Sequence, residues 1–204
     1  MKNNKPAVIG DTKGLRNKNT SETSKVAIGG KSDKTVEELS KEFLAMDNDA
    51  KINYITNLES FDPDIIALVF SDKSEDVRLA AAKSLCWFET DQKNILPFIA
   101  LAMNDVSRQL RDESYKLMDS LDDKNDVLIL MESSMNSDFS DVRLTAVSKF
   151  IDLDISREDV KALVVKALSD DDKEVRRQSI LSASFLWDQE FSSEDEAIKY
   201  LSKR

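Results

Sequence analysis

Four arginines recur along this chain at a nearly constant spacing. Arg78, Arg111, Arg143 and Arg176 are separated by 33, 32 and 33 residues, and an aspartate lies five or six residues before each of them. Self-similarity at such a period is typical of proteins built from stacked supersecondary units, because one unit cannot bury its apolar side alone. The spacing therefore predicts a repeat architecture before any single residue is assigned a role.

Apolar or small residues keep fixed positions relative to these arginines. They occur one residue before and three, seven and ten residues after each arginine, which are offsets on one face of an α-helix. The small residues at the third position should let a neighbouring helix approach closely. They are Ala81, Ser114, Ala146 and Ser179.

A second helix is predicted before each arginine helix. Apolar residues lie eight and twelve residues before each arginine, and an acidic turn follows them. Residues 36–46 and 50–61 form a degenerate first pair, with Lys51 near the arginine position, and a last helix opens at 192–195 and ends at Leu201 as a cap. The other expected pairs are 62–70 with 74–89, 92–103 with 106–121, 124–135 with 139–153, and 157–168 with 172–188.

Glycine usage supports a helical chain. All four glycines lie in the first 30 residues, so the rest of the chain has no residue suited to turns with positive φ. Helix starts are also recognisable, since Asp62 precedes Pro63 and Ser156 precedes a charged first turn. We expect helices that are joined by short polar turns.

The segment from Asp72 to Leu85 reads DKSEDVRLAAAKSL and resembles the HEAT-type repeat, whose turn and second helix follow roughly D-x-x-x-x-V-R-x-x-A-A-x-A-L. Residues 138–150 and 170–183 follow the same pattern more loosely. The resemblance covers about residues 36–190. It implies an all-α fold, a right-handed α-solenoid of about five helical hairpins with a C-terminal capping helix.

Residues 1–35 differ from the rest of the chain. They carry a net charge of +5, against −15 for residues 36–204, and few apolar groups, so we expect a disordered basic tail. Two similar islands, 5–10 and 25–29, could be a duplicated linear motif that docks as an extended peptide, or a chance likeness. Gly30-Lys31-Ser32 matches only the end of a phosphate-binding loop and lacks its other glycine and its strand.

Composition excludes several functions. The chain has no histidine, which removes histidine-based acid–base catalysis, nucleophile activation and metal sites, and its single cysteine, Cys86, is expected to be buried in a helix. We expect no metal and no cofactor. The chain has no apolar run of membrane-spanning length and no apolar signal segment, so a cytoplasmic location is the simplest expectation.

The recurring aspartates and arginines are interpreted as scaffold. An aspartate at the turn can cap the second helix, and an arginine can reach an acidic group or a carbonyl of the adjacent unit, which would form a ladder along the stack. Repetition in every copy fits a structural role better than a unique site. These positions are Asp72, Arg78, Asp105, Arg111, Asp138, Arg143, Asp171 and Arg176.

Departures from the repeat are the better functional candidates. Trp87 and Phe185 stand nine residues after their arginines, off the apolar stripe, and are predicted either to anchor a partner or to be covered by packing. Trp187 is expected to pack under the capping helix. Lys83, Lys116 and Lys149 form a second possible stripe, for which a solvated helix face is the alternative interpretation.

The leading hypothesis is a non-enzymatic scaffold that holds a peptide or helix of another protein on its second-helix face, with the tail as a second contact. One alternative is a bilin lyase-like protein that handles a tetrapyrrole, with Tyr115 and Glu113 as the available reactive groups. A nucleic-acid-binding protein similar to the HEAT-type DNA glycosylases is the other alternative. The net charge of −15 makes nucleic-acid binding the least expected of the three.

Overall fold

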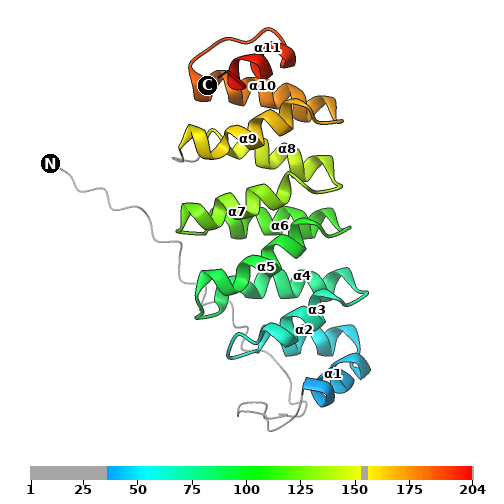
Figure 1. The fold of residues 1–204 in the computed structure, drawn as a ribbon. Helices are drawn as coiled ribbons and strands as arrows, with labels where there is room; N and C mark the ends of the chain where they lie inside the picture. The colour runs from blue at the N-terminus through cyan, green and yellow to red at the C-terminus, as the bar shows by residue number, and fades with distance from the viewer. Residues whose placement is uncertain (1–35, 153–155, 204) are drawn as a thin grey trace, which may run out of the picture. The chain divides into compact units, whose positions relative to one another are not determined.

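The computed structural model describes residues 36–152 and 156–203, and every regular element in these residues is helical. Figure 1 shows the helices following one another in chain order. The odd-numbered helices are α1 (Val36–Ala45), α3 (Pro63–Phe70), α5 (Gln92–Met103), α7 (Lys124–Ser134), α9 (Arg157–Leu168) and α11 (Glu194–Leu201). The even-numbered helices are α2 (Asn48–Thr56), α4 (Glu75–Ser84), α6 (Arg108–Asp119), α8 (Ser140–Lys149) and α10 (Lys173–Trp187), and a 3₁₀-helix, η2 (Leu85–Trp87), follows α4.

The prediction of an all-α fold is therefore confirmed for the described part of the chain. The expectations for residues 1–35, which include the two apolar islands and Gly30-Lys31-Ser32, lie outside the described residues.

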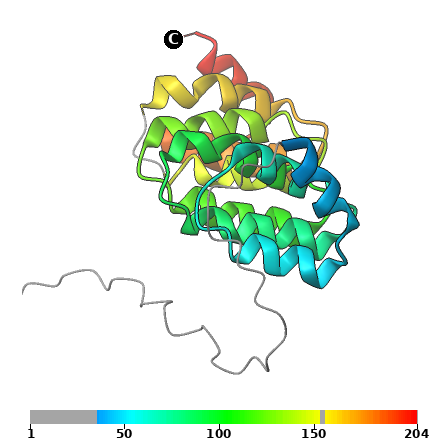
Figure 2. The same ribbon diagram turned by 90° about the horizontal axis from the view of Figure 1, so that it is seen from below.

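Helices that are adjacent in the chain pack as pairs, α3 with α4, α5 with α6, α7 with α8, and α9 with α10. The pairs also contact one another in order. On one side α3 packs between α1 and α5, and α7 packs on α5; on the other side α4 packs between α2 and α6, and α10 packs on α8. Figure 2 shows these two layers of helices, and α11 packs on both α9 and α10 at the C-terminal end.

The helix starts follow the local chemistry that the sequence indicates. The Asp62 side chain accepts hydrogen bonds from the amides of Asp64 and Ile65, with Pro63 at the first helical position. At α11, the Ser193 hydroxyl accepts from the Glu196 amide, while the Glu196 carboxylate accepts from the amide and hydroxyl of Ser192. These bonds satisfy amides at the first turn that have no partner within the helix.

The second helix of each pair is shorter than the apolar pattern predicts. α4 ends at Ser84, where the 3₁₀-helix η2 begins, and the backbone is extended at Phe88. The Phe88 ring packs edge-on against Phe61 with 5.6 Å between centroids. The first pair also differs, since α2 begins at Asn48, where Asp47 caps the Ala50 amide, rather than at residue 50. Helix ends therefore depend on packing and capping beyond the apolar repeat.

The expectation that Cys86 is buried is wrong. Cys86 and Trp87 are both exposed, whereas Leu85 beside them is buried. The chain winds at about three residues per turn in η2, so these side chains leave the stripe that a continuing α-helix would maintain. The thiol instead lies 3.2 Å from the carbonyl oxygen of Lys83.

One large apolar cluster extends through the pairs from Ile66 in α3 to Leu201 in α11, and a smaller cluster around Phe43 and Ile55 lies at the N-terminal end. Trp187 is buried in the large cluster together with Ala197 of α11, as the sequence predicts. The four small residues three positions after the arginines are buried as well, namely Ala81, Ser114, Ala146 and Ser179. None of the described helices is long and apolar enough to cross a lipid bilayer.

Candidate functional site

The most regular polar feature is a ladder of ion pairs between successive even-numbered helices. Each arginine lies four residues after the N-cap of its helix. From this position its guanidinium reaches both the turn before its own helix and the adjacent helix pair. The arginines are those of the repeat, and their N-caps are Ser74, Ser107, Phe139 and Asp172.

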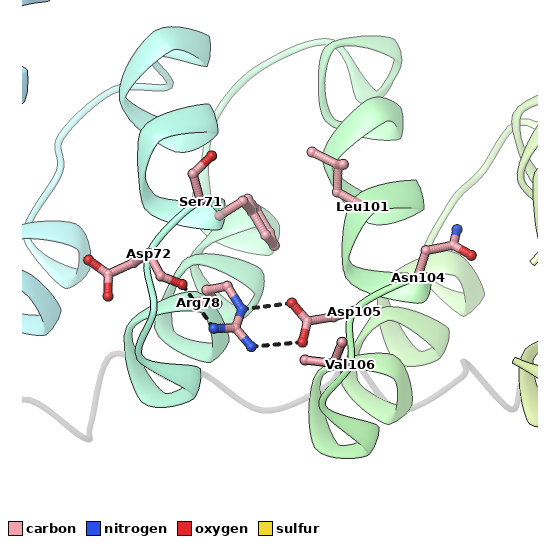
Figure 3. Close-up of a pocket in the computed structure, with 8 residues that line it drawn as sticks. Ser71, Asp72, Arg78, Leu101, Asn104, Asp105 and Val106 are labelled. Carbon is pink, nitrogen blue, oxygen red and sulfur yellow. Dashed lines mark hydrogen bonds and ion pairs between the residues drawn. The ribbon is translucent and has the colours of Figure 1, made fainter. Parts of the chain in front are cut away.

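Arg78 illustrates one rung, which Figure 3 shows at the edge of a cavity. Its Nε and Nη2 atoms donate to the two carboxylate oxygens of Asp105 at 2.7 and 2.9 Å, and Nη1 donates to the carbonyl oxygens of Asp72 and Lys73. The two-pronged contact with Asp105 fixes the position of the next turn, and the carbonyl bonds fix the turn of its own pair.

The rung at Arg143 repeats this geometry and adds a third carboxylate contact. Arg143 binds Asp170 through Nε and Nη2 at 2.7 and 2.8 Å, and Nη2 also donates to Asp171 at 2.6 Å. Arg176 donates to the carbonyl oxygens of Asp170 and Asp171 and forms a 3.4 Å ion pair with Glu194 of α11. The ladder therefore ends on the last helix.

Lys51 begins the ladder in the first pair. It follows the N-cap Asp47 by four residues, as the arginines follow theirs, and its Nζ donates to Asp72 Oδ2 at 2.7 Å. Lys51 is buried and also lies over the Phe43 ring, 5.3 Å from its centroid. In the degenerate first pair, a lysine therefore supplies the positive charge that an arginine supplies in the other pairs.

The rung between α6 and α8 departs from the pattern. Arg111 binds Asp141, inside the first turn of α8, with both Nε and Nη2 directed at the same oxygen at 3.1 and 2.8 Å, and it stacks over the Phe139 ring. Ser137, rather than an aspartate, supplies the turn carbonyl that Arg143 contacts. The sequence-predicted Asp138 is exposed and is the partner of neither arginine.

The ladder aspartates do not cap the second helices directly. Asp72, Asp105 and Asp170 each accept a hydrogen bond from the amide two residues on, which belongs to the N-cap residue itself. Burial raises the pKa of Asp105, but the bonds from Arg78 and the Ser107 amide outweigh this, so its pKa lies below the ordinary value. The pKa values of Asp72 and Asp170 are lowered for the same reasons.

A shallow cavity of about 380 Å³ lies between the turn of the second pair and that of the third. In Figure 3, the Arg78–Asp105 rung forms one side of this cavity. Leu101, on α5, and Asn104, directly after α5, also line it. The Arg78 guanidinium and the Asp105 carboxylate at this cavity are hydrogen-bonded to each other. The lining residues are Phe70, Ser71, Asp72, Arg78, Leu101, Asn104, Asp105 and Val106.

The two candidate anchors are exposed but are not brought together. Trp87, in η2 after α4, is 58% exposed, and Phe185 near the end of α10 is 65% exposed. The helices α6 and α8 lie between them, so about three interhelix steps of about 8–10 Å each separate the two side chains. Phe185 has an apolar neighbour in Leu181, one helical turn earlier and also exposed.

The three candidate lysines have different surroundings. Lys83 is exposed, whereas Lys116 forms a 2.8 Å ion pair with Glu113 on its own helix. Lys149 is partly buried and forms a 2.7 Å ion pair with Asp119 of α6. The stripe therefore contains two charges that are already paired, and it is less basic than the sequence pattern alone indicates.

The sequence analysis did not predict five exposed aliphatic side chains, namely Leu44, Leu101, Val106, Ile129 and Leu181. Leu181 stands five residues after its arginine, the position that Lys83 and Lys116 occupy in their repeats. The lysines at this position indicate that it faces solvent, so the exposure of Leu181 could have been predicted. Leu44, Leu101 and Ile129 lie on the odd-numbered helices α1, α5 and α7, and Val106 lies in a turn. The sequence gives no signal for exposure at these four positions, because apolar residues recur throughout both kinds of helix.

Tyr115 and Glu113, the groups required by the enzymatic alternative, do not form a shared reactive cluster. The Glu113 carboxylate is held by Lys116, and burial raises the pKa of Tyr115 to about 12, far from the range of an efficient acid or base at neutral pH. In the described part of the chain, no group of three or more acidic or cysteine side chains is arranged to hold a metal ion.

Comparisons of the chain with protein-family models, with curated proteins and with solved structures found no match.

Proposed function

We propose that this chain is a non-enzymatic scaffold that binds another protein on the face formed by its even-numbered helices. The observation that carries the proposal is the exposure of two large aromatic side chains, Trp87 in η2 directly after α4 and Phe185 in α10. Aromatic anchors contribute much of the free energy at protein interfaces, and exposing them to water without a partner is unfavourable.

The fold class within this proposal is a right-handed, HEAT-like α-solenoid of about five hairpins capped by α11. The ordered packing of helix pairs and the ladder that joins them support it, because in such proteins each unit contacts only its neighbours. The ladder uses the repeat arginines and their aspartates for these contacts. The departures from the repeat are then the part of the surface that is available for recognition.

The recognised partner is a protein segment rather than a nucleic acid. Residues 36–204 carry a net charge of −15, and two of the three lysines on the proposed face are paired with carboxylates, which leaves little charge to neutralise phosphates. An extended peptide or an amphipathic helix could reach both aromatics, since about three interhelix steps span about 25–30 Å.

The test substitutes the two aromatics and measures capture of interacting proteins. Trp87→Ala and Phe185→Ala, alone and combined, should reduce the recovery of specific proteins in a pull-down read by mass spectrometry. Ile129→Ala is the matched control, because Ile129 is similarly exposed at 53% but lies on α7 in the other layer. Its captured proteins should match those of the wild-type chain.

Denaturant unfolding of the same variants separates binding from folding. Because both aromatics are more than half exposed, their substitution should leave the free energy of unfolding within about 0.5 kcal/mol of the wild-type value. A large loss of stability, or unchanged capture by the double variant, would contradict the proposal. Deleting residues 1–35 in a parallel pull-down tests the proposed second contact through the tail.

A further inference from the structure

The joint between α6 and α8 differs from the other joints in the even-numbered layer. α4 packs directly on α6, and α8 packs directly on α10, but α6 and α8 approach each other less closely. In the other layer, α7 and α9 are also less closely packed than α3 and α5 or α5 and α7. The change in packing thus involves both layers around the fourth pair.

Side-chain size accounts for the wider spacing between α6 and α8. Four residues after the arginine, α4 carries Ala82, which packs with Leu110 of α6. α8 carries Val147 at that offset, and Ser182 of α10 donates to its carbonyl oxygen at 3.0 Å, so these two backbones are close. α6 carries Tyr115 at the same offset, whose bulk keeps α8 at a distance.

Two ion pairs connect the helices across this joint. Arg111 of α6 binds Asp141 of α8, and Lys149 of α8 binds Asp119 of α6. The acidic partners are partly exposed, with side-chain exposures of 40% for Asp141 and 53% for Asp119, whereas the ladder aspartates at 105 and 170 are nearly buried. Ion pairs with exposed members stabilise weakly and are screened by salt.

The Tyr115 hydroxyl is a further sign of incomplete packing at the joint. It is buried and makes no hydrogen bond of normal geometry, the only such side-chain atom in the described residues, although the Thr145 hydroxyl of α8 lies close enough to act on its pKa. A buried polar atom without a partner raises the free energy of the closed arrangement. An opening that let water reach this hydroxyl would recover part of that energy.

We propose that the α6/α8 joint is a hinge that sets the spacing between the two aromatic anchors. Trp87 lies on the N-terminal side of the joint and Phe185 on the C-terminal side, so a small rotation there moves one anchor relative to the other. The hinge adapts the face to partners of different length. The adaptation to partners rests on the proposed function, whereas the motion itself is a property of the free chain.

Paired spin labels measure the motion in the full-length protein without any partner. One label is attached to the native, exposed Cys86 and a second to Arg177→Cys on α10, which spans the joint. In each of two control pairs, both labels lie on the same side of the joint. They are Cys86 with Asp112→Cys on α6, and Ser148→Cys with Arg177→Cys in a Cys86→Ser chain.

The distance distribution across the joint should be broader than both control distributions, and molar salt should broaden it further without affecting the controls. Lys149→Gln should act in the same direction as salt, because it breaks a contact across the joint. Lys116→Gln is its matched control, since it breaks an ion pair within α6. A cross-joint distribution as narrow as the controls, or one unaffected by salt and by Lys149→Gln, would overturn the hinge while leaving the proposed binding face intact.

Discussion

At the scale of single residues, the Tyr115 hydroxyl is the one buried side-chain nitrogen or oxygen atom in the described residues that lacks a well-formed hydrogen bond. Its ring packs against the apolar core, while its hydroxyl has only a poorly aligned contact with Thr145. The two parts of the side chain therefore have opposite effects on stability. The ring contributes apolar contacts, while the hydroxyl has lost its bonds to water.

Tyr115→Phe should leave the chain as stable as the wild type or stabilise it by about 1 kcal/mol, because it removes only a buried hydroxyl that lacks a well-formed hydrogen bond. Tyr115→Ala should destabilise the chain by about 3 kcal/mol through the loss of the ring. Equilibrium urea unfolding followed by circular dichroism measures both. A loss of more than about 1 kcal/mol in Tyr115→Phe would mean that the hydroxyl is hydrogen-bonded.

At the scale of elements, the arginine rungs join each helix pair to the next, and their burial differs along the chain. The Arg143–Asp170 pair is nearly buried, with side-chain exposures of 10% and 7%. The Arg176–Glu194 pair at the end of the ladder is more open, at 31% and 39%. Loss of one partner leaves an uncompensated charge, and the cost of that charge grows with burial.

Arg143→Met should therefore lower the free energy of unfolding by about 3–5 kcal/mol, because it strands the Asp170 carboxylate in a buried place. Arg176→Met serves as the matched control and should cost about 1 kcal/mol, as expected for an exposed pair. Urea unfolding of both variants provides the comparison. Equal losses would show that burial of the rung does not determine its contribution.

At the scale of the whole molecule, the lowered pKa values of Asp72, Asp105 and Asp170 link stability to pH. A carboxyl group whose pKa is lower in the folded state binds protons more readily when unfolded. Its contribution is complete above the unfolded pKa and is lost as the pH falls through the folded pKa. Three such groups are distributed along the ladder, so acid should weaken several joints together.

Stability should hence change little between about pH 7 and pH 5, and should fall steeply below about pH 4, where the ladder carboxylates become protonated. Urea midpoints across this range measure the effect. Asp170→Asn should give a less stable chain with a shallower acid limb, because one of the linked groups is gone. An acid limb of unchanged steepness in this variant would contradict a role for the ladder.

The sequence by itself determined the helical class, the pairing of helices and the ion pairs of the repeat arginines with neighbouring units. These features are encoded by short-range periodicity and by local capping, as at Asp62, so they are visible without knowledge of the neighbours. The sequence placed Trp87 and Phe185 off the apolar stripe but left open whether they are exposed or covered by other segments, and the structure shows them exposed.

Only the tertiary structure decided features that depend on residues far apart in the chain. The exposure of Cys86 follows from the 3₁₀ turn that ends α4, and the choice of Asp141 over Asp138 as the partner of Arg111 follows from where α8 begins. The spacing at Tyr115 depends on the side chains of two helices at once. Local patterns specify which face of a helix is buried, whereas the distance and contacts between faces are set by the side chains that meet there, which no single segment contains.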